Sequence, residues 1–182
     1  MSTVLVAAIL VGTVIAICLL FITITNKQKA RKLNQLLNRF SELGTSHNLA
    51  FSSQEVLNNS IIGLDGINRK ILVLTQIDNR SFDDFIVNLD EVKNCTVSKI
   101  YSHINYGNLR NVNLEKYLER IVLYFEFTDI KDPVEIVFYS HIDNTIYQIE
   151  EMEQKAVYWK QILTKMLKDS IKKQPVLARR NS

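Results

Sequence analysis

The chain begins with a stretch of twenty-one residues without a charged side chain, from Val4 to Ile24. At a rise of about 1.5 Å per residue, a helix of this length spans roughly 30 Å, the thickness of the hydrocarbon core of a bilayer. The stretch therefore predicts a transmembrane anchor over residues 1–25. A cleaved signal peptide is the main alternative, but Met1-Ser2-Thr3 lacks the basic side chains with which such peptides begin.

Four basic residues follow the apolar stretch directly: Lys27, Lys29, Arg31 and Lys32. Basic residues next to a span tend to stay on the cytoplasmic side of the membrane. This cluster therefore predicts the topology of a single-pass protein of the inner (plasma) membrane. Its short N-terminus is expected outside and its C-terminal domain in the cytoplasm.

The next segment, residues 26–47, has the pattern of a short amphipathic juxtamembrane helix. Its apolar residues recur at intervals of three and four, and Gly44 stands where such a helix would end; they are Leu33, Leu36, Leu37, Phe40 and Leu43. Two heptads are too few for a coiled coil, so packing on the protein's own domain is favoured over a homodimer. A helix lying in the lipid interface is a further alternative, because basic residues flank the stripe.

Residues 48–168 have room for one domain, and the pattern changes there to short runs typical of β-strands. The Asp65-Gly66 pair predicts a hairpin turn between the first two runs. The expected strands are 60–65, 69–77, 85–89, 95–101, 120–127 and 134–140. An asparagine-rich polar loop is expected over residues 105–116.

The last predicted element is a helix over residues 146–168, with one apolar stripe made of Ile149, Met152, Ala156, Trp159, Leu163 and Met166. Strands followed by a single helix predict an α+β fold, in which an antiparallel sheet or partly open barrel is capped by that helix. This order, with Trp159 in the last helix, resembles the pleckstrin-homology-like superfold.

A second resemblance concerns the first hairpin, Ile61-Ile62-Gly63-Leu64-Asp65 through Lys70-Ile71-Leu72-Val73-Leu74. It is similar to the opening of small uncharacterised membrane-anchored proteins of the Bacteroidota, which implies one N-terminal span before a pleckstrin-homology-like cytoplasmic domain. The resemblance implies no activity and no cofactor. Inositol-lipid binding at this hairpin is disfavoured, because only Arg69 and Lys70 stand there, beside Asp65.

The C-terminal segment, residues 169–182, is expected to be a basic, disordered tail. The basic residues here and at the end of the last helix are candidate contacts for anionic lipid headgroups. They are Lys165, Lys168, Lys172, Lys173, Arg179 and Arg180.

Residues with catalytic or metal-binding chemistry do not form a recognisable motif. His47, His103 and His141 have no ligand spacing, and Cys95 fits a small, half-buried strand residue better than a nucleophile. Trp159 lies on the apolar stripe, so its basic neighbours do not indicate nucleic-acid binding. We therefore expect no catalytic residue, no metal, no cofactor and no nucleic-acid partner.

Together these patterns predict a non-enzymatic, single-pass membrane protein that presents a cytoplasmic interaction domain to an unidentified protein partner. The alternative is a sensor of the anionic membrane surface, which would use the basic residues of the C-terminal tail.

Overall fold

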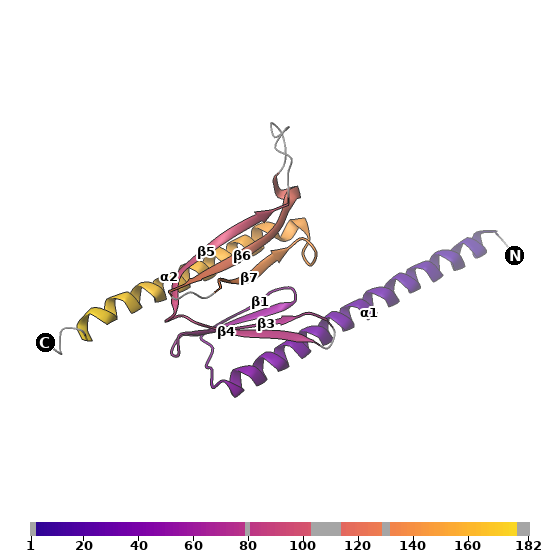
Figure 1. Ribbon diagram of the computed structural model, residues 1–182. Helices are drawn as coiled ribbons and strands as arrows, with labels where there is room; N and C mark the ends of the chain where they lie inside the picture. Colours follow the sequence, from indigo (N-terminus) through magenta and orange to yellow (C-terminus); the bar gives the residue numbers. More distant parts are fainter. Residues whose placement is uncertain (1–2, 79–80, 103–113, 129–131, 178–182) are drawn as a thin grey trace.

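The computed structural model describes residues 3–78, 81–102, 114–128 and 132–177. A long helix comes first, seven strands follow, and a second long helix closes the fold (Figure 1). The elements are α1 (Thr3–Ser46), β1 (Ser53–Val56), β2 (Ser60–Asp65), β3 (Lys70–Gln76), β4 (Phe82–Asn88), β5 (Val92–Tyr101), η2 (Leu114–Tyr117), β6 (Leu118–Phe127), β7 (Val134–Ser140), η3 (Ile146–Gln148) and α2 (Ile149–Leu177). The predicted α+β class is confirmed.

The strands form two antiparallel sheets, which we call sheet A and sheet B. Sheet A has the order β1-β2-β3-β4, and sheet B has the order β5-β6-β7. The predicted hairpin is β2–β3, in which Ile62 pairs with Val73. Only β1 was missed, because the sequence Ser53-Gln54-Glu55-Val56 has little apolar character to mark a strand.

The main core lies where the inner faces of both sheets meet α2. Strand residues such as Ile62, Val73, Leu123 and Phe125 are buried there. Five of the six predicted stripe residues of α2 are buried in the same core: Ile149, Met152, Ala156, Trp159 and Leu163. The sixth, Met166, packs against it partly buried. Two ion pairs tie α2 to the sheets, Lys155–Glu55 at 3.1 Å on β1 and Lys99–Glu153 at 2.7 Å on β5.

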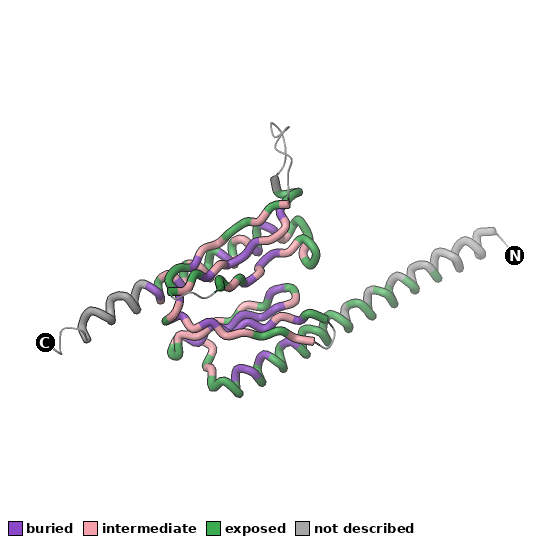
Figure 2. Tube along the Cα trace, in the orientation of Figure 1, coloured by how far each residue is buried: buried purple, intermediate pink, exposed green. Residues whose placement is uncertain are grey.

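A second, smaller core lies on the outer face of sheet A, under the C-terminal half of α1. There Leu36, Phe40 and Leu43 bury themselves against side chains of β2 and β3, namely Ile61, Leu72 and Leu74. Because successive strand residues face opposite sides, sheet A is covered on both faces, as the buried segments in Figure 2 show. The predicted packing of this stripe on the protein's own domain is confirmed for these three residues, whereas Leu33 and Leu37 stay exposed.

One continuous helix, α1, takes the place of the two helices expected over 1–25 and 26–47. Residues 25–43 contain neither glycine nor proline, so nothing in the sequence interrupts the helix there. Among the described residues, no helix provides a stretch long and apolar enough to cross a membrane.

The other long helix, α2, continues to Leu177 instead of ending at Lys168. The beginning of the segment expected to be a disordered tail is therefore helical. Residues 169–174 contain no helix breaker, and lysine is a good helix former, which favours a helix up to Gln174. The last turn of α2 also includes Pro175, for which helix propensity gives no reason. Residues 105–113, most of the predicted polar loop, lie outside the described residues, and the rest of the loop belongs to η2.

Candidate functional site

The most distinctive surface feature is a cleft between α1 and the turns at one end of the two sheets, which we call the α1 cleft. It has a volume of about 530 Å³, within the range of small-molecule sites. Its walls come from α1, the β1–β2 turn, the end of β3 with the residues after it, and the turn after β7. The lining residues are Lys29, Lys32, Leu33, Leu36, Val56, Leu57, Asn58, Asn59, Gln76, Ile77, Asp78 and Asp143.

Charges of both signs line the α1 cleft. Lys29 and Lys32 are exposed on α1, three residues apart and therefore on neighbouring positions of one helix face. The carboxylates of Asp78 and Asp143 belong to the other wall, built by the turns. Two lysines and two aspartates give the lining a formal net charge of zero.

Gln76, at the end of β3, contributes a buried polar group to the cleft. Its backbone N–H donates to the Asn59 carbonyl at 2.8 Å, which holds the β1–β2 turn against β3. Its side-chain amide nitrogen Nε2 is buried, and within the described part of the chain it has no hydrogen-bond partner. A buried donor left unsatisfied costs about 1–3 kcal/mol.

The turns that form the outer wall are held together by Asn58. Its side-chain amide Nδ2 donates a hydrogen bond to the backbone carbonyl of Asp143, which joins the β1–β2 turn to the turn after β7. This contact connects sheet A to sheet B at the mouth of the cleft. The wall is therefore positioned by tertiary structure, not by one local turn.

A smaller cleft of about 330 Å³ adjoins the first and lies between the two sheets. The two clefts share Asn59, Ile77 and Asp143. Arg120 and Glu135 form an ion pair at 3.2 Å in the lining of the smaller cleft, so they neutralise each other. Asp83 and Asp143 also belong to the lining of the smaller cleft.

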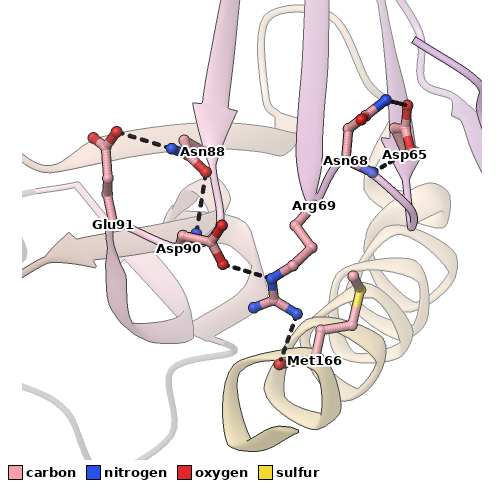
Figure 3. A network of polar contacts seen from close by, with 7 residues as sticks. All are labelled: Asp65, Asn68, Arg69, Asn88, Asp90, Glu91 and Met166. Carbon is pink, nitrogen blue, oxygen red and sulfur yellow. Dashed lines mark hydrogen bonds and ion pairs between the residues drawn. The ribbon is translucent and has the colours of Figure 1, made fainter. Parts of the chain in front are cut away.

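A polar network at the β2–β3 turn is structural (Figure 3). Asp65 is fully buried, and its carboxylate accepts hydrogen bonds from the backbone N–H groups of Ala50, Ile67 and Asn68. Burial raises the pKa of Asp65, but the hydrogen bonds outweigh it and hold the pKa below the usual 3.8. The carboxylate is fully used in fixing this turn.

Arg69 extends the same network to α2. It lies at a positive φ of 54°, its Nε donates to Asp90 at 2.6 Å, and its Nη1 donates to the Met166 carbonyl at 3.2 Å. It thereby joins the β2–β3 turn, the β4–β5 turn and α2. The two basic residues considered for inositol-lipid binding, Arg69 and Lys70, thus do not form a basic pocket.

The four basic residues predicted to set the membrane topology lie in two different environments. Lys27, Lys29, Arg31 and Lys32 are all exposed on α1, but only Lys29 and Lys32 line the α1 cleft. Of the predicted headgroup contacts, Lys165 is exposed on α2. Lys168, Lys172 and Lys173 belong to the last turns of α2, and Arg179 and Arg180 lie outside the described residues.

These C-terminal lysines lie far from the N-terminal end of α1. Figure 1 shows the C-terminal end of α2 and the N-terminal end of α1 projecting from opposite sides of the domain. The two basic clusters of the sequence are therefore not brought together.

Groups with catalytic or metal-binding potential are separate in the described residues, which contain no cluster of histidine, cysteine and acidic side chains suited to a metal. His47 and His141 are exposed, and His103 lies outside the described residues. Cys95 is buried rather than half-buried, and burial raises the pKa of its thiol to about 12, with Lys160 lowering it only partly. A neutral thiol is a poor nucleophile, which agrees with a packing role.

Five polar cleft residues were not predicted from the sequence: Asn58, Asn59, Gln76, Asp78 and Asp143. They come from distant parts of the chain, and none has a local motif. Their only shared signal is a polar side chain next to the end of a strand, which is also typical of ordinary turns.

No family model, curated protein or solved structure matches this chain. The chemistry of the site therefore follows from its own geometry.

Proposed function

We propose that this chain is a non-enzymatic, single-pass membrane protein. It holds a pleckstrin-homology-like domain at the cytoplasmic face of the inner membrane, where the domain binds a protein partner. The observation that carries the proposal is the form of α1. The helix is continuous from an uncharged N-terminal half to a C-terminal half docked on sheet A.

The exposure of the N-terminal half of α1 supports the membrane part of the proposal. Large apolar side chains are exposed on this half of the helix: Ile17, Leu19, Leu20, Phe21 and Ile24. Each fully buried side chain of this kind gains about 1.5–3 kcal/mol relative to exposure in water, so a helix left uncovered would be strongly unfavourable. Lipid would cover it, and the docked half would then fix how the domain faces the membrane.

The strand order supports the pleckstrin-homology-like part of the proposal. A sheet of four strands, a sheet of three strands and a C-terminal helix that packs on sheet B and shares the core between the sheets agree with the expectation of a partly open barrel capped by a helix. A fold alone does not define a function, so the proposal of a protein partner depends on the side chains that the surface of the domain exposes.

Exposed apolar side chains near the start of α2 support a protein partner. Ile142 is 81% exposed and Tyr147 is 93% exposed, and Ile146 between them is also exposed. Tyrosine is enriched at protein interfaces, because it combines a large apolar ring with a hydroxyl group.

Two measurements test the proposal. Alkaline carbonate extraction should leave the full chain in the membrane pellet, and recovery in the supernatant would contradict the anchor. Affinity capture from detergent-solubilised membranes should then retain a partner that a fragment of residues 1–47 does not retain.

A double variant tests whether the partner binds the exposed apolar side chains near the start of α2. The pair Ile142→Ser and Tyr147→Ser should lose the partner. Ile67→Ser, which removes an equally exposed apolar side chain (86%) at the β2–β3 turn, should keep it. If the domain retains nothing beyond the 1–47 control, the interaction part of the proposal is wrong.

The alternative, a sensor of the anionic membrane surface through the C-terminal basic residues, has less support. If α1 enters the membrane, the C-terminal end of α2 points away from it (Figure 1). Lys165 and the lysines that follow would then lie on the far side of the domain from the leaflet.

A further inference from the structure

We propose that the domain makes a second contact with the membrane, through exposed apolar and tyrosine side chains at one end of the two sheets. These side chains are Val56, Ile77, Tyr101 and Tyr117, and we call this surface the end face. It contacts the interfacial layer of the bilayer as a surface, and not one bound headgroup. The inference rests on the membrane anchor proposed above and goes beyond it, because this contact fixes the domain against the leaflet.

The sheet A part of the end face consists of two neighbouring strand ends. Val56 is the last residue of β1, and Ile77 directly follows β3. The Gln76 N–H donates to the Asn59 carbonyl at 2.8 Å, which holds the β1–β2 turn against the end of β3. Val56 and Ile77 therefore lie together, and both line the α1 cleft.

The sheet B part lies at the same end of the fold. Tyr101 is the last residue of β5, Tyr117 directly precedes β6, and the Ser102 N–H donates to the Tyr117 carbonyl at 2.9 Å. Because β7 is antiparallel to β6, the turn after β7 also lies at this end. The hydrogen bond from the Asn58 amide to the Asp143 carbonyl then joins this turn to the β1–β2 turn of sheet A.

Exposed apolar side chains are concentrated at this end of the domain. Ten large apolar or aromatic side chains are exposed in the described residues after α1, and seven of them lie here: Val56, Ile77, Tyr101, Tyr117, Ile142, Ile146 and Tyr147. Such a concentration marks an interaction surface. Three of the seven are tyrosines, which are enriched where proteins meet the membrane interface, since the ring is apolar and the hydroxyl group stays hydrated.

The position of the end face along α1 brings it to the leaflet. Figure 1 shows the turns of this end on the side of the domain from which the N-terminal half of α1 projects. Ile77 shares the lining of the α1 cleft with Lys29, which follows Ile24 by five residues, or about 7.5 Å along a helix. The headgroup layer is about 5–7 Å deep, so a span that ends at Ile24 places Ile77 at its outer boundary.

Charged side chains of both signs share this end of the domain. They are Lys29, Lys32, Lys116, Asp78, Asp143 and Glu115. The acidic side chains oppose attraction to an anionic leaflet, so the contact depends on the burial of apolar and aromatic surface and not on lipid charge. A protein partner that binds Ile142 and Tyr147 would meet the domain beside this leaflet contact.

The test uses the full chain in nanodiscs of phosphatidylcholine. Single cysteines are introduced into a background of Cys18→Ser with Cys95→Ala and are labelled with the fluorophore bimane. Ile77→Cys and Tyr117→Cys report on the end face. Their matched controls lie elsewhere on the domain: Ile67→Cys is 86% exposed, against 69% for Ile77, and Val157→Cys is 38% exposed, like Tyr117.

Quenchers in the lipid and in the water locate each label. Labels on the end face should lose fluorescence to lipids that carry a nitroxide near the headgroup, and they should be shielded from iodide in the water. The two control positions should show the reverse. Ile77→Ser should reduce the lipid quenching of the label at position 117, since both positions belong to one contact, whereas Ile67→Ser should leave it unchanged. Added phosphatidylglycerol should change neither result.

The outcomes separate this inference from the proposed function. A chain that does not enter the nanodisc overturns both the anchor and the end-face contact. A chain that enters, but whose end-face and control labels are quenched equally, overturns the contact and leaves the anchor standing. Two further results also overturn the contact. End-face labels shielded from both quenchers would show that another copy of the chain covers this surface. Lipid quenching that requires phosphatidylglycerol would show attraction by charge.

Discussion

Asp65 is a charged side chain that the fold buries completely. It can stay ionised there because three backbone N–H groups and the amide of Asn68 point at its carboxylate, the latter at 2.7 Å. The same contacts join the residues after α1 to the β2–β3 turn, since Ala50 is one of the donors. One carboxylate therefore fixes both a hairpin and the return of the chain from α1.

We predict that Asp65→Asn lowers the free energy of unfolding by roughly 1–3 kcal/mol, because a neutral amide turns an N–H group toward donors that then lack an acceptor. Urea denaturation followed by Trp159 fluorescence measures the change. Asp84→Asn is the matched control, since Asp84 is exposed on β4 and should leave stability nearly unchanged.

The pH dependence of stability follows from the lowered pKa of Asp65. The folded pKa lies below the unfolded value of 3.8, so the stabilisation is complete above about pH 3.8 and is lost as the pH falls through the folded pKa. We expect stability to fall less steeply in acid for Asp65→Asn than for the native chain. Equal slopes below pH 4 would show that Asp65 does not stabilise the fold through its charge.

Cys95 provides a second test at the residue scale. Because its thiol is buried and its pKa is raised to about 12, it should resist alkylation at neutral pH until the domain unfolds. Iodoacetamide labelling in a Cys18→Ser background, with and without urea, measures this protection. Ser98→Cys with Cys95→Ser moves the thiol to an exposed position of the same strand and should react at once.

At the scale of elements, the contact of α1 with sheet A depends on Gly63. A Cβ atom at this position would lie 2.5 Å from Cζ of Phe40 and 2.7 Å from Cδ1 of Phe51. These two rings stack at a centroid distance of 4.7 Å, which leaves them little room to move. The glycine is therefore required by the close approach of helix and sheet, and not by its backbone angles.

We predict that Gly63→Ala destabilises the chain by about 1–3 kcal/mol, the usual cost of overpacking, and loosens α1 from sheet A. Hydrogen exchange of residues 36–46 should rise in the variant. Gly66→Ala is the control, because its nearest neighbour is Oγ of Ser52 at 3.1 Å, a single flexible side chain. An unchanged exchange rate in Gly63→Ala would mean that the two rings can shift without releasing the helix.

At the scale of the whole molecule, α1 and α2 leave the domain in opposite directions (Figure 1). In the proposed membrane protein this arrangement puts one end of the sheets, with the α1 cleft, toward the leaflet. The start of α2 follows the turn after β7, which lines the cleft through Asp143, so the exposed side chains of Ile142 and Tyr147 lie near this same end. The orientation of the molecule would depend on the basic residues that follow the span.

We predict that replacing Lys27, Lys29, Arg31 and Lys32 by glutamine, with three lysines added after Met1, inverts the protein in the membrane, since basic residues near a span set its orientation. Protease treatment of intact spheroplasts would then digest the domain, which is protected in the native protein. Replacing Lys165, Lys168, Lys172 and Lys173 by glutamine should not change orientation, because these residues of α2 lie far from the span. Protection of the domain in both variants would contradict the predicted topology.

The sequence by itself determined the α+β class, the β2–β3 hairpin, the next strands and the buried stripe of α2. These features depend on residue spacing along one element, since side chains alternate on a strand and repeat every three or four positions on a helix. The burial of Leu36, Phe40 and Leu43 was predictable for the same reason.

Only the tertiary structure decided what lies between elements. Strand β1 is short and polar and is held by pairing with β2. The α1 cleft combines Lys29, Asn58, Gln76 and Asp143, which are distant in the chain and individually ordinary. A local pattern cannot show such a site, because the contacts that create it form only when the two sheets and α1 pack together.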